Sequence, residues 1–123
     1  MKGFNISEKV IEYILSRKID EFETLDVNSV SRVLDINRSY LSKKFKSERN
    51  CSLSEYIFFI KILRSVCLLE MVDELSVERL STIMGFASVD YFIRVFKQKV
   101  GTTPGRFKKN YKQIKSSKLL DLC

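Results

Sequence analysis

The sequence repeats itself at a separation of about fifty residues, and this repeat restricts the fold more than any other feature of the chain. Residues 40–46 (YLSKKFK) align with residues 91–97 (YFIRVFK) at an offset of 51, and the match continues to Tyr56 and Phe107. Ahead of these segments the offset is 50, as in Val30 and Leu80. Each copy therefore predicts a short helix, a tight turn and a second helix, with the second turn one residue longer.

The composition favours an all-α fold. A chain of 123 residues with one Pro and four Gly contains few helix breakers, and 45% hydrophobic residues suffice for a core. We expect one domain over residues 1–111 and a basic tail over 112–123. Its parts are a first helix over 7–18 capped by Ser7, a polar connector over 20–24, a first helix-turn-helix unit over 26–50, a central helix over 54–71, a second unit over 76–101 and a final helix over 104–111.

The positive charge is concentrated in two stretches. The net charge is +7, yet residues 35–50 carry +3 and residues 89–123 carry +7, so the remainder is acidic. A local basic surface suits a polyanion, because each neutralised phosphate releases counterions. A solvated basic face with a Lys-rich tail would explain the charge equally well.

The second helix of each copy divides into two faces. At about 100° per residue, Leu41 and Phe45 project to one side of their helix and Phe92 and Phe96 to one side of theirs. The opposite sides carry short polar and charged residues: Ser39, Ser42, Lys43 and Lys46 in the first copy, and Asp90, Arg94 and Lys97 in the second. A helix that reads the DNA major groove needs this division. Any amphipathic surface helix also has a charged face, but two matched helices favour DNA.

The same residues resemble the AraC/XylS family of bacterial transcription regulators. The strongest match is Ile83-Met84-Gly85-Phe86-Ala87-Ser88, followed by residues 91–97 and by Val100-Gly101-Thr102-Thr103-Pro104 with Phe107. The residues that match the family's first unit are Ser39-Tyr40-Leu41-Ser42, Phe45-Lys46 and Ser54-Glu55-Tyr56. The resemblance covers about residues 7 to 111 and implies seven helices, in which two helix-turn-helix units are joined by the long central helix.

The resemblance implies a sequence-specific double-stranded DNA-binding protein that regulates transcription, by activation, with the two recognition helices in successive major grooves. RNA polymerase is then a partner, and family members often carry an effector-binding or dimerisation domain besides this one. The alternative is a helical interaction or dimerisation module that has lost specific DNA binding.

Other classes of protein fit the sequence less well. A chain without histidine, paired carboxylates or a Gly-rich phosphate loop is not expected to be an enzyme or to hold a metal or cofactor. An odd number of cysteines, three, argues for the reducing cytoplasm. No signal peptide or uncharged apolar run of spanning length is visible, so no membrane association is expected.

By position and by resemblance, two sets of residues are expected to contact DNA. The expected base-contacting residues are Ser39, Ser42, Lys43, Asp90 and Arg94. The expected backbone-contacting residues are Asn37, Arg38, Lys46, Ser88, Tyr91 and Lys97. Two residues depart from the family pattern. Asp35 stands where a turn glycine is usual, although Asp tolerates a left-handed backbone better than most residues. Asp90 stands where an uncharged residue is usual. Its carboxylate repels phosphate but could accept a hydrogen bond from the N4 amino group of cytosine.

Overall fold

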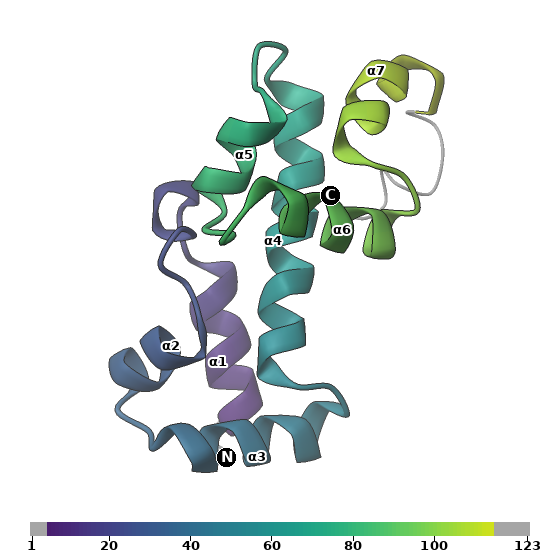
Figure 1. The fold of residues 1–123 in the computed structure, drawn as a ribbon. Coiled ribbons are helices and arrows are strands. Elements are labelled where there is room, and N and C mark those ends of the chain that lie inside the picture. Colours follow the sequence, from purple (N-terminus) through teal and green to yellow (C-terminus); the bar gives the residue numbers. More distant parts are fainter. Residues whose placement is uncertain (1–4, 115–123) are drawn as a thin grey trace. The chain divides into compact units, whose positions relative to one another are not determined.

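The computed structural model describes residues 5–114, and these form seven α-helices, one short 3-10 helix (η1) and no strand (Figure 1). The elements are α1 (Ile6–Leu15), η1 (Ile19–Glu21), α2 (Val27–Leu34), α3 (Arg38–Arg49), α4 (Leu53–Met71), α5 (Val77–Ile83), α6 (Val89–Val100) and α7 (Pro104–Ile114). The predicted all-α class with seven helices is confirmed. The final helix continues to Ile114 rather than ending at Tyr111, because residues 112–114 contain no helix breaker. The remainder of the predicted tail, 115–123, lies outside the described residues.

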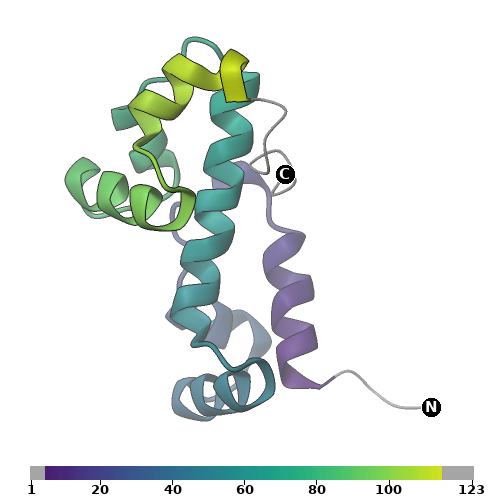
Figure 2. The same cartoon turned by 90° about the vertical axis from the view of Figure 1, so that its right-hand side faces the viewer.

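The chain divides into two compact units, unit 1 (Met1–Phe58) and unit 2 (Phe59–Cys123). Helix α4 begins in unit 1 and ends in unit 2. Within unit 1, α3 packs against α1 and α2; within unit 2, α6 packs against α5 and α7 (Figures 1 and 2). Each unit therefore holds one of the two predicted recognition helices, α3 or α6, in contact with the short helix that precedes it in the chain.

The start of α1 differs from the prediction. Asn5, not Ser7, is the N-cap: its side chain accepts from the backbone N–H of Glu8, and the Glu8 carboxylate accepts from the backbone N–H of Asn5. This is a capping box, in which each side chain satisfies the other residue's amide. Ser7 is fully buried inside the helix and bonds to α3 instead. The helix also ends at Leu15, short of the predicted Lys18.

The connector between α1 and α2 is less polar than expected. Phe22 follows η1 directly and is 0% exposed, and Leu25 is also buried. The acidic neighbours Asp20, Glu21 and Glu23 remain exposed. This connector therefore contributes an aromatic ring to the buried apolar residues of the first unit, although the sequence around it reads as a polar loop.

The two turns of the repeat have matching backbone geometry. Asp35 (φ 56°) and Gly85 (φ 77°) both lie in the left-handed region. At each turn an amide reaches back five residues: Ile36 donates to the Ser31 carbonyl and Phe86 to the Ser81 carbonyl, both at 3.0 Å. This bond is the mark of a helix ended by a left-handed residue. Asp35 therefore takes the place of a glycine without altering the turn, and the second turn is one residue longer before its next cap, as predicted.

The match continues beyond the recognition helices. Asn50 (φ 63°) and Gly101 (φ 97°) end α3 and α6, each donating its amide at 2.8 Å to a lysine carbonyl four residues earlier. Ser52 and Thr103 then cap α4 and α7 through their hydroxyls. Aromatic pairs hold each recognition helix to the helix that follows: Phe45 to Tyr56 with ring centroids 5.6 Å apart, and Phe96 to Phe107 at 6.1 Å. The repeat therefore includes the first turns of α4 and α7.

Candidate DNA interface

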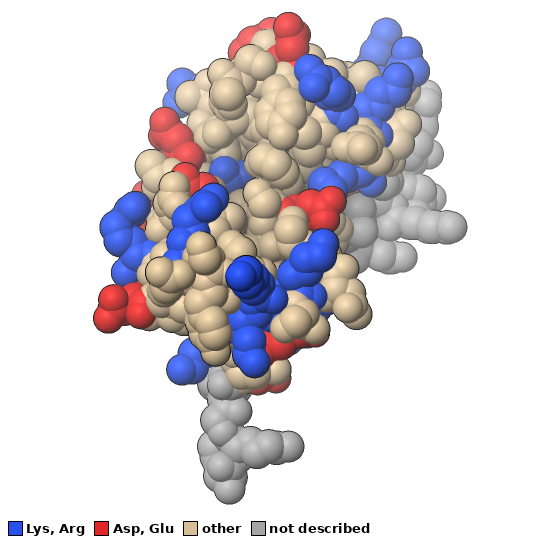
Figure 3. All heavy atoms as spheres, turned by 60° about the horizontal axis from the view of Figure 1, so that its bottom comes forward, with Lys and Arg blue, Asp and Glu red and all other residues tan. Residues whose placement is uncertain are grey.

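Helix α3 presents a polar and basic face opposite its apolar one. Asn37 caps the helix by accepting from the Tyr40 amide at 3.1 Å. Leu41 and Phe45 are fully buried. The exposed predicted residues are Asn37, Arg38, Ser39, Lys43 and Lys46, and Ser42 is half-buried. Figure 3 brings the α3 end of the molecule forward and shows Lys and Arg gathered there. The six predicted residues of unit 1 thus lie on or directly before one helix.

An open groove of about 500 Å³ runs beside this face. It is lined by Val27, Arg38, Ser42, Lys43, Lys46, Ser47, Ser52, Leu53 and Ser54. The groove therefore joins the basic side chains of α3 to the first turn of α4, where backbone amides carry partial positive charge. Ser47, Ser52 and Ser54 were not among the predicted site residues.

Helix α6 presents the corresponding face in unit 2. Ser88 caps it by accepting from the Tyr91 amide at 3.1 Å, and Phe92 and Phe96 are fully buried. The predicted residues Ser88, Asp90, Arg94 and Lys97 are exposed, and Tyr91 is half-buried. The five predicted residues of unit 2 therefore lie on or directly before one helix, separate from the set in unit 1.

Arg94 lies on an aromatic platform. Its guanidinium carbon is 5.6 Å from the centroid of the Tyr91 ring, and that ring is 5.9 Å from the Phe86 ring. The ion pairs found in the described part of the chain do not include one between Arg94 and Asp90, four residues apart. A guanidinium held over a ring keeps its five N–H donors at the edge of the plane, where they can form hydrogen bonds with another molecule.

The capping residues keep a free donor. Asn37 and Ser88 use a side-chain oxygen as acceptor, which leaves the Asn37 amide N–H₂ and the Ser88 hydroxyl hydrogen able to donate to phosphate.

Tyr40 is a residue that the sequence reasoning missed. It is 53% exposed on α3 and aligns with Tyr91, which was predicted.

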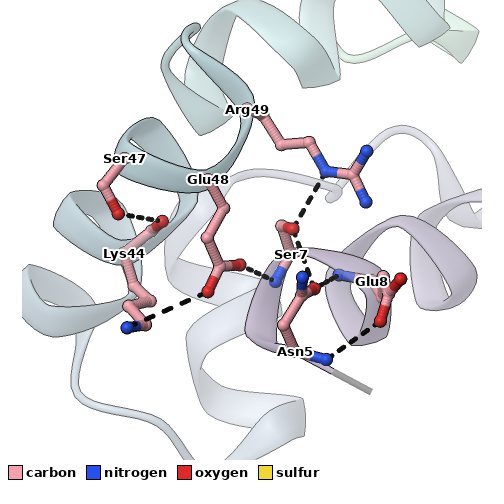
Figure 4. Close-up of polar contacts among 7 residues, drawn as sticks. All are labelled: Asn5, Ser7, Glu8, Lys44, Ser47, Glu48 and Arg49. Carbon is pink, nitrogen blue, oxygen red and sulfur yellow. Dashed lines mark hydrogen bonds and ion pairs between the residues drawn. The ribbon is translucent and has the colours of Figure 1, made fainter.

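The opposite side of α3 is tied to α1 by a polar network (Figure 4). Glu48 Oε1 accepts from the Ser7 backbone N–H at 2.7 Å, and Arg49 Nε donates to the Ser7 hydroxyl at 2.9 Å. Lys44 Nζ is 4.0 Å from Glu48 Oε2. The bond from the Ser7 amide lowers the pKa of Glu48 below its usual value, against the opposing effect of burial.

Residues 5–114 lack two further kinds of site. No helix there combines the length and apolar character needed to span a membrane. No three His, Cys, Asp or Glu residues in this range lie close enough together to hold a metal ion.

The chain is similar to known helix-turn-helix proteins. Residues 30–110 match the family model described as a helix-turn-helix domain. The Msm operon regulatory protein of Streptococcus mutans is 37% identical over 86 residues, which are 70% of this chain and 31% of that protein. The C-terminal domain of the two-component response regulator yesN from Fusobacterium nucleatum is 26% identical, with a TM-score of 0.70 over 85% of this chain and 99% of that one.

A third similarity concerns the fold alone. The DNA-binding domain of AdpA, solved in complex with a target DNA, is 18% identical, with a TM-score of 0.72 over 89% of this chain and 96% of that one. The chain spans only 22% to 31% of the length of three of its relatives, among them the Xylose operon regulatory protein of Haemophilus influenzae.

Proposed function

Because the chain belongs to the AraC/XylS family of bacterial transcription regulators, we propose that it recognises a specific DNA sequence by inserting α3 and α6 into successive major grooves. The observation that supports this proposal is the repeated division of the two helices. Each has two fully buried aromatic or aliphatic residues on one side and exposed polar and charged residues on the other. Matching caps and matching turns place these faces at equivalent positions of the two copies.

The groove beside α3 supports two separate roles for the exposed residues of unit 1, contact with the DNA backbone and contact with base edges. Arg38, Lys43 and Lys46 line it with exposed positive charge, and the first turn of α4 adds backbone amides. Ser42 and Lys43 also line this groove, and Ser39 is exposed on the same helix. Phosphate contacts fix the position of a protein on DNA, whereas contacts to base edges specify the sequence. We therefore assign Ser39, Ser42 and Lys43 to bases and Asn37, Arg38 and Lys46 to the backbone.

In unit 2, the corresponding assignment gives Asp90 and Arg94 to bases and Ser88, Tyr91 and Lys97 to the backbone. The alternative, a dimerisation module without specific DNA binding, leaves the basic outward face of α3 without a role. It also leaves unexplained why Arg94 is supported by an aromatic ring at the exposed surface of α6.

Activation is the regulatory outcome we propose. Among the structural neighbours is one described as a xylose-binding transcription activator, 26% identical with a TM-score of 0.64 over 89% of this chain. Activation requires contact with RNA polymerase, and a longer protein of this family would add an effector-binding or dimerisation domain. A regulator of this kind acts on the bacterial chromosome and therefore in the cytoplasm.

Selection of bound sequences from a random pool of double-stranded DNA tests the function directly. We expect enrichment of one sequence, and Kd for it should depend strongly on salt. With roughly four to eight phosphates neutralised, log K should fall with log salt at a slope of about −4 to −7. A pool without enrichment, or a flat salt response, would rule out sequence-specific DNA binding.

A pair of matched variants locates the binding face. The double variant Lys43→Gln with Lys46→Gln removes two charges from α3, and Lys9→Gln with Lys18→Gln removes two exposed charges elsewhere in unit 1. The first should make the salt slope less steep by about one unit, because Lys46 is the one of its two residues that is assigned to a phosphate. The second should leave it unchanged. Equal effects of the two would show that charge alone, not this face, drives binding.

A further inference from the structure

Glu48 and Arg49 are charged residues of a recognition helix that contact another part of the protein. Glu48 is six residues beyond Ser42 and nine beyond Ser39, which at about 100° per residue places it opposite Ser39 on α3. It lies on the same side of the helix as the buried Leu41, and its side chain is only 16% exposed. A direct role for Glu48 in contacting DNA is therefore excluded by its position on the helix.

The contacts of these two residues converge on Ser7. The Glu48 carboxylate accepts from the Ser7 backbone amide, and the Arg49 guanidinium donates to the Ser7 hydroxyl (Figure 4). The Ser7 amide is one of the first amides of α1, which have no acceptor within their own helix. Ser7 also donates its hydroxyl to Asn5 Oδ1, the oxygen that caps α1. The network therefore joins the capped end of α1 to the C-terminal half of α3.

Apolar packing holds α3 through many van der Waals contacts, each of which is weak and has little directional preference. Hydrogen bonds to a charged group are directional and stronger. Two such bonds from one side of α3 to a single residue of α1 fix both the rotation of α3 about its axis and its position along it. Side chains that recognise a ligand must be held within about 0.5 Å of their working geometry. Hydrogen bonds between their helix and a neighbouring helix help to hold them there.

We propose that Glu48 is a positioning residue for DNA recognition, which through Ser7 of α1 orients the base-contacting side chains of α3. This inference rests on the proposed function, because it assigns to Glu48 a share in the specificity of that same interface. It distinguishes the polar α1–α3 contact from the apolar core: the core keeps unit 1 folded, and the contact aligns one helix for reading bases.

The test compares Kd for the selected DNA site with Kd for a scrambled duplex. Glu48→Ala removes the acceptor and should raise Kd for the selected site about fivefold, leaving Kd for scrambled DNA unchanged or lower. Removing a negative charge by itself lowers Kd for DNA. The expected rise in Kd for the selected site is therefore opposite to the electrostatic effect of the substitution. Glu48→Gln keeps an acceptor oxygen and should restore Kd to within about twofold of wild type.

The control removes the same charge elsewhere in unit 1. Glu12 is exposed on α1, and Glu12→Ala should leave both values of Kd unchanged or slightly lower. Circular dichroism at the assay temperature gives the folded fraction of each variant. Should Glu48→Ala fold poorly, Ser7→Ala removes the Arg49 contact without changing charge and should weaken only selected-site binding, about two- to threefold.

Two results would overturn the positioning role. In one, Glu48→Ala behaves as Glu12→Ala does; in the other, it weakens binding to both duplexes equally, as a loss of folded protein would. Failure of the wild type to prefer the selected site would instead contradict the proposed function.

Discussion

Arg94 is the residue on which the proposed specificity of unit 2 depends most. Its guanidinium rests over the Tyr91 ring and is exposed at the surface. If Arg94 donates to O6 and N7 of a guanine, Arg94→Ala should cost about 1–3 kcal/mol of binding free energy and relax the preference at one base pair. Binding of wild type and variant to all single-base variants of the selected site measures both effects.

Lys97→Ala serves as the matched control, because it removes the same charge from the same helix. It should weaken binding about equally for all sequences and make the salt slope less steep by about one. The same uniform pattern for Arg94→Ala would show that Arg94 contacts phosphate. No change in affinity on any sequence would remove Arg94 from the interface.

The residues that sequence reasoning placed correctly are those whose roles are local. Asp35 was expected to tolerate the left-handed turn, and it lies there with φ 56°. Asp26 and Ser88 cap α2 and α6, as aspartate and serine directly before a helix commonly do. Ser7 was assigned wrongly, because a serine before an apolar stripe reads as a cap while its partner, Arg49, is 42 residues away. A sequence pattern carries no signal of so distant a contact.

At the scale of elements, the contact between α1 and α3 should depend on pH. A carboxylate whose pKa is lowered in the folded protein stabilises it above the unfolded pKa, and this contribution is lost as pH falls through the folded pKa. For Glu48 that loss should begin below its usual value of 4.5. The positive charges of Lys44 and Arg49 beside it act in the same direction on the pKa of Glu48.

Chemical denaturation of wild type and Glu48→Gln measures this contribution. Because the amide of Gln accepts a hydrogen bond but does not titrate, the difference in free energy of unfolding should be constant from about pH 7 to 5. It should then shrink as the pH is lowered further. A difference that stayed constant down to about pH 3 would show that the Glu48 charge contributes nothing to the α1–α3 contact.

Helices were easier to predict than the segment between α1 and α2. The repeated apolar spacing predicted two helix-turn-helix units over 26–50 and 76–101, and α2, α3, α5 and α6 lie within these bounds. The connector was misread because Phe22 stands alone among acidic residues, with no periodic pattern to mark it. Its burial is a tertiary effect, which periodicity within a short window does not report.

At the scale of the whole molecule, the proposal requires both units to act on one DNA duplex. Helix α4 begins in unit 1, ends in unit 2 and has 19 residues. Successive major grooves on one face of unbent DNA lie about 34 Å apart. If the two recognition helices do not match this spacing, we expect the DNA to bend on binding or one unit to dock more weakly.

The two units have similar turns but different reading faces. Unit 1 offers Ser39, Ser42 and Lys43, whereas unit 2 offers Asp90 and Arg94. A single chain should therefore recognise two different half-sites. This expectation follows from aligning the two copies of the repeat.

Hydroxyl-radical footprinting on the selected DNA site tests most directly whether two recognition helices bind successive major grooves. One monomer should protect an asymmetric site of about two helical turns, with protected regions on one face of the duplex and no palindrome. Substituting Arg94 should weaken protection at one end, and substituting Lys43 should weaken it at the other. Protection confined to a single half-turn, or a palindromic footprint that appears only with two chains bound, would contradict binding through both units.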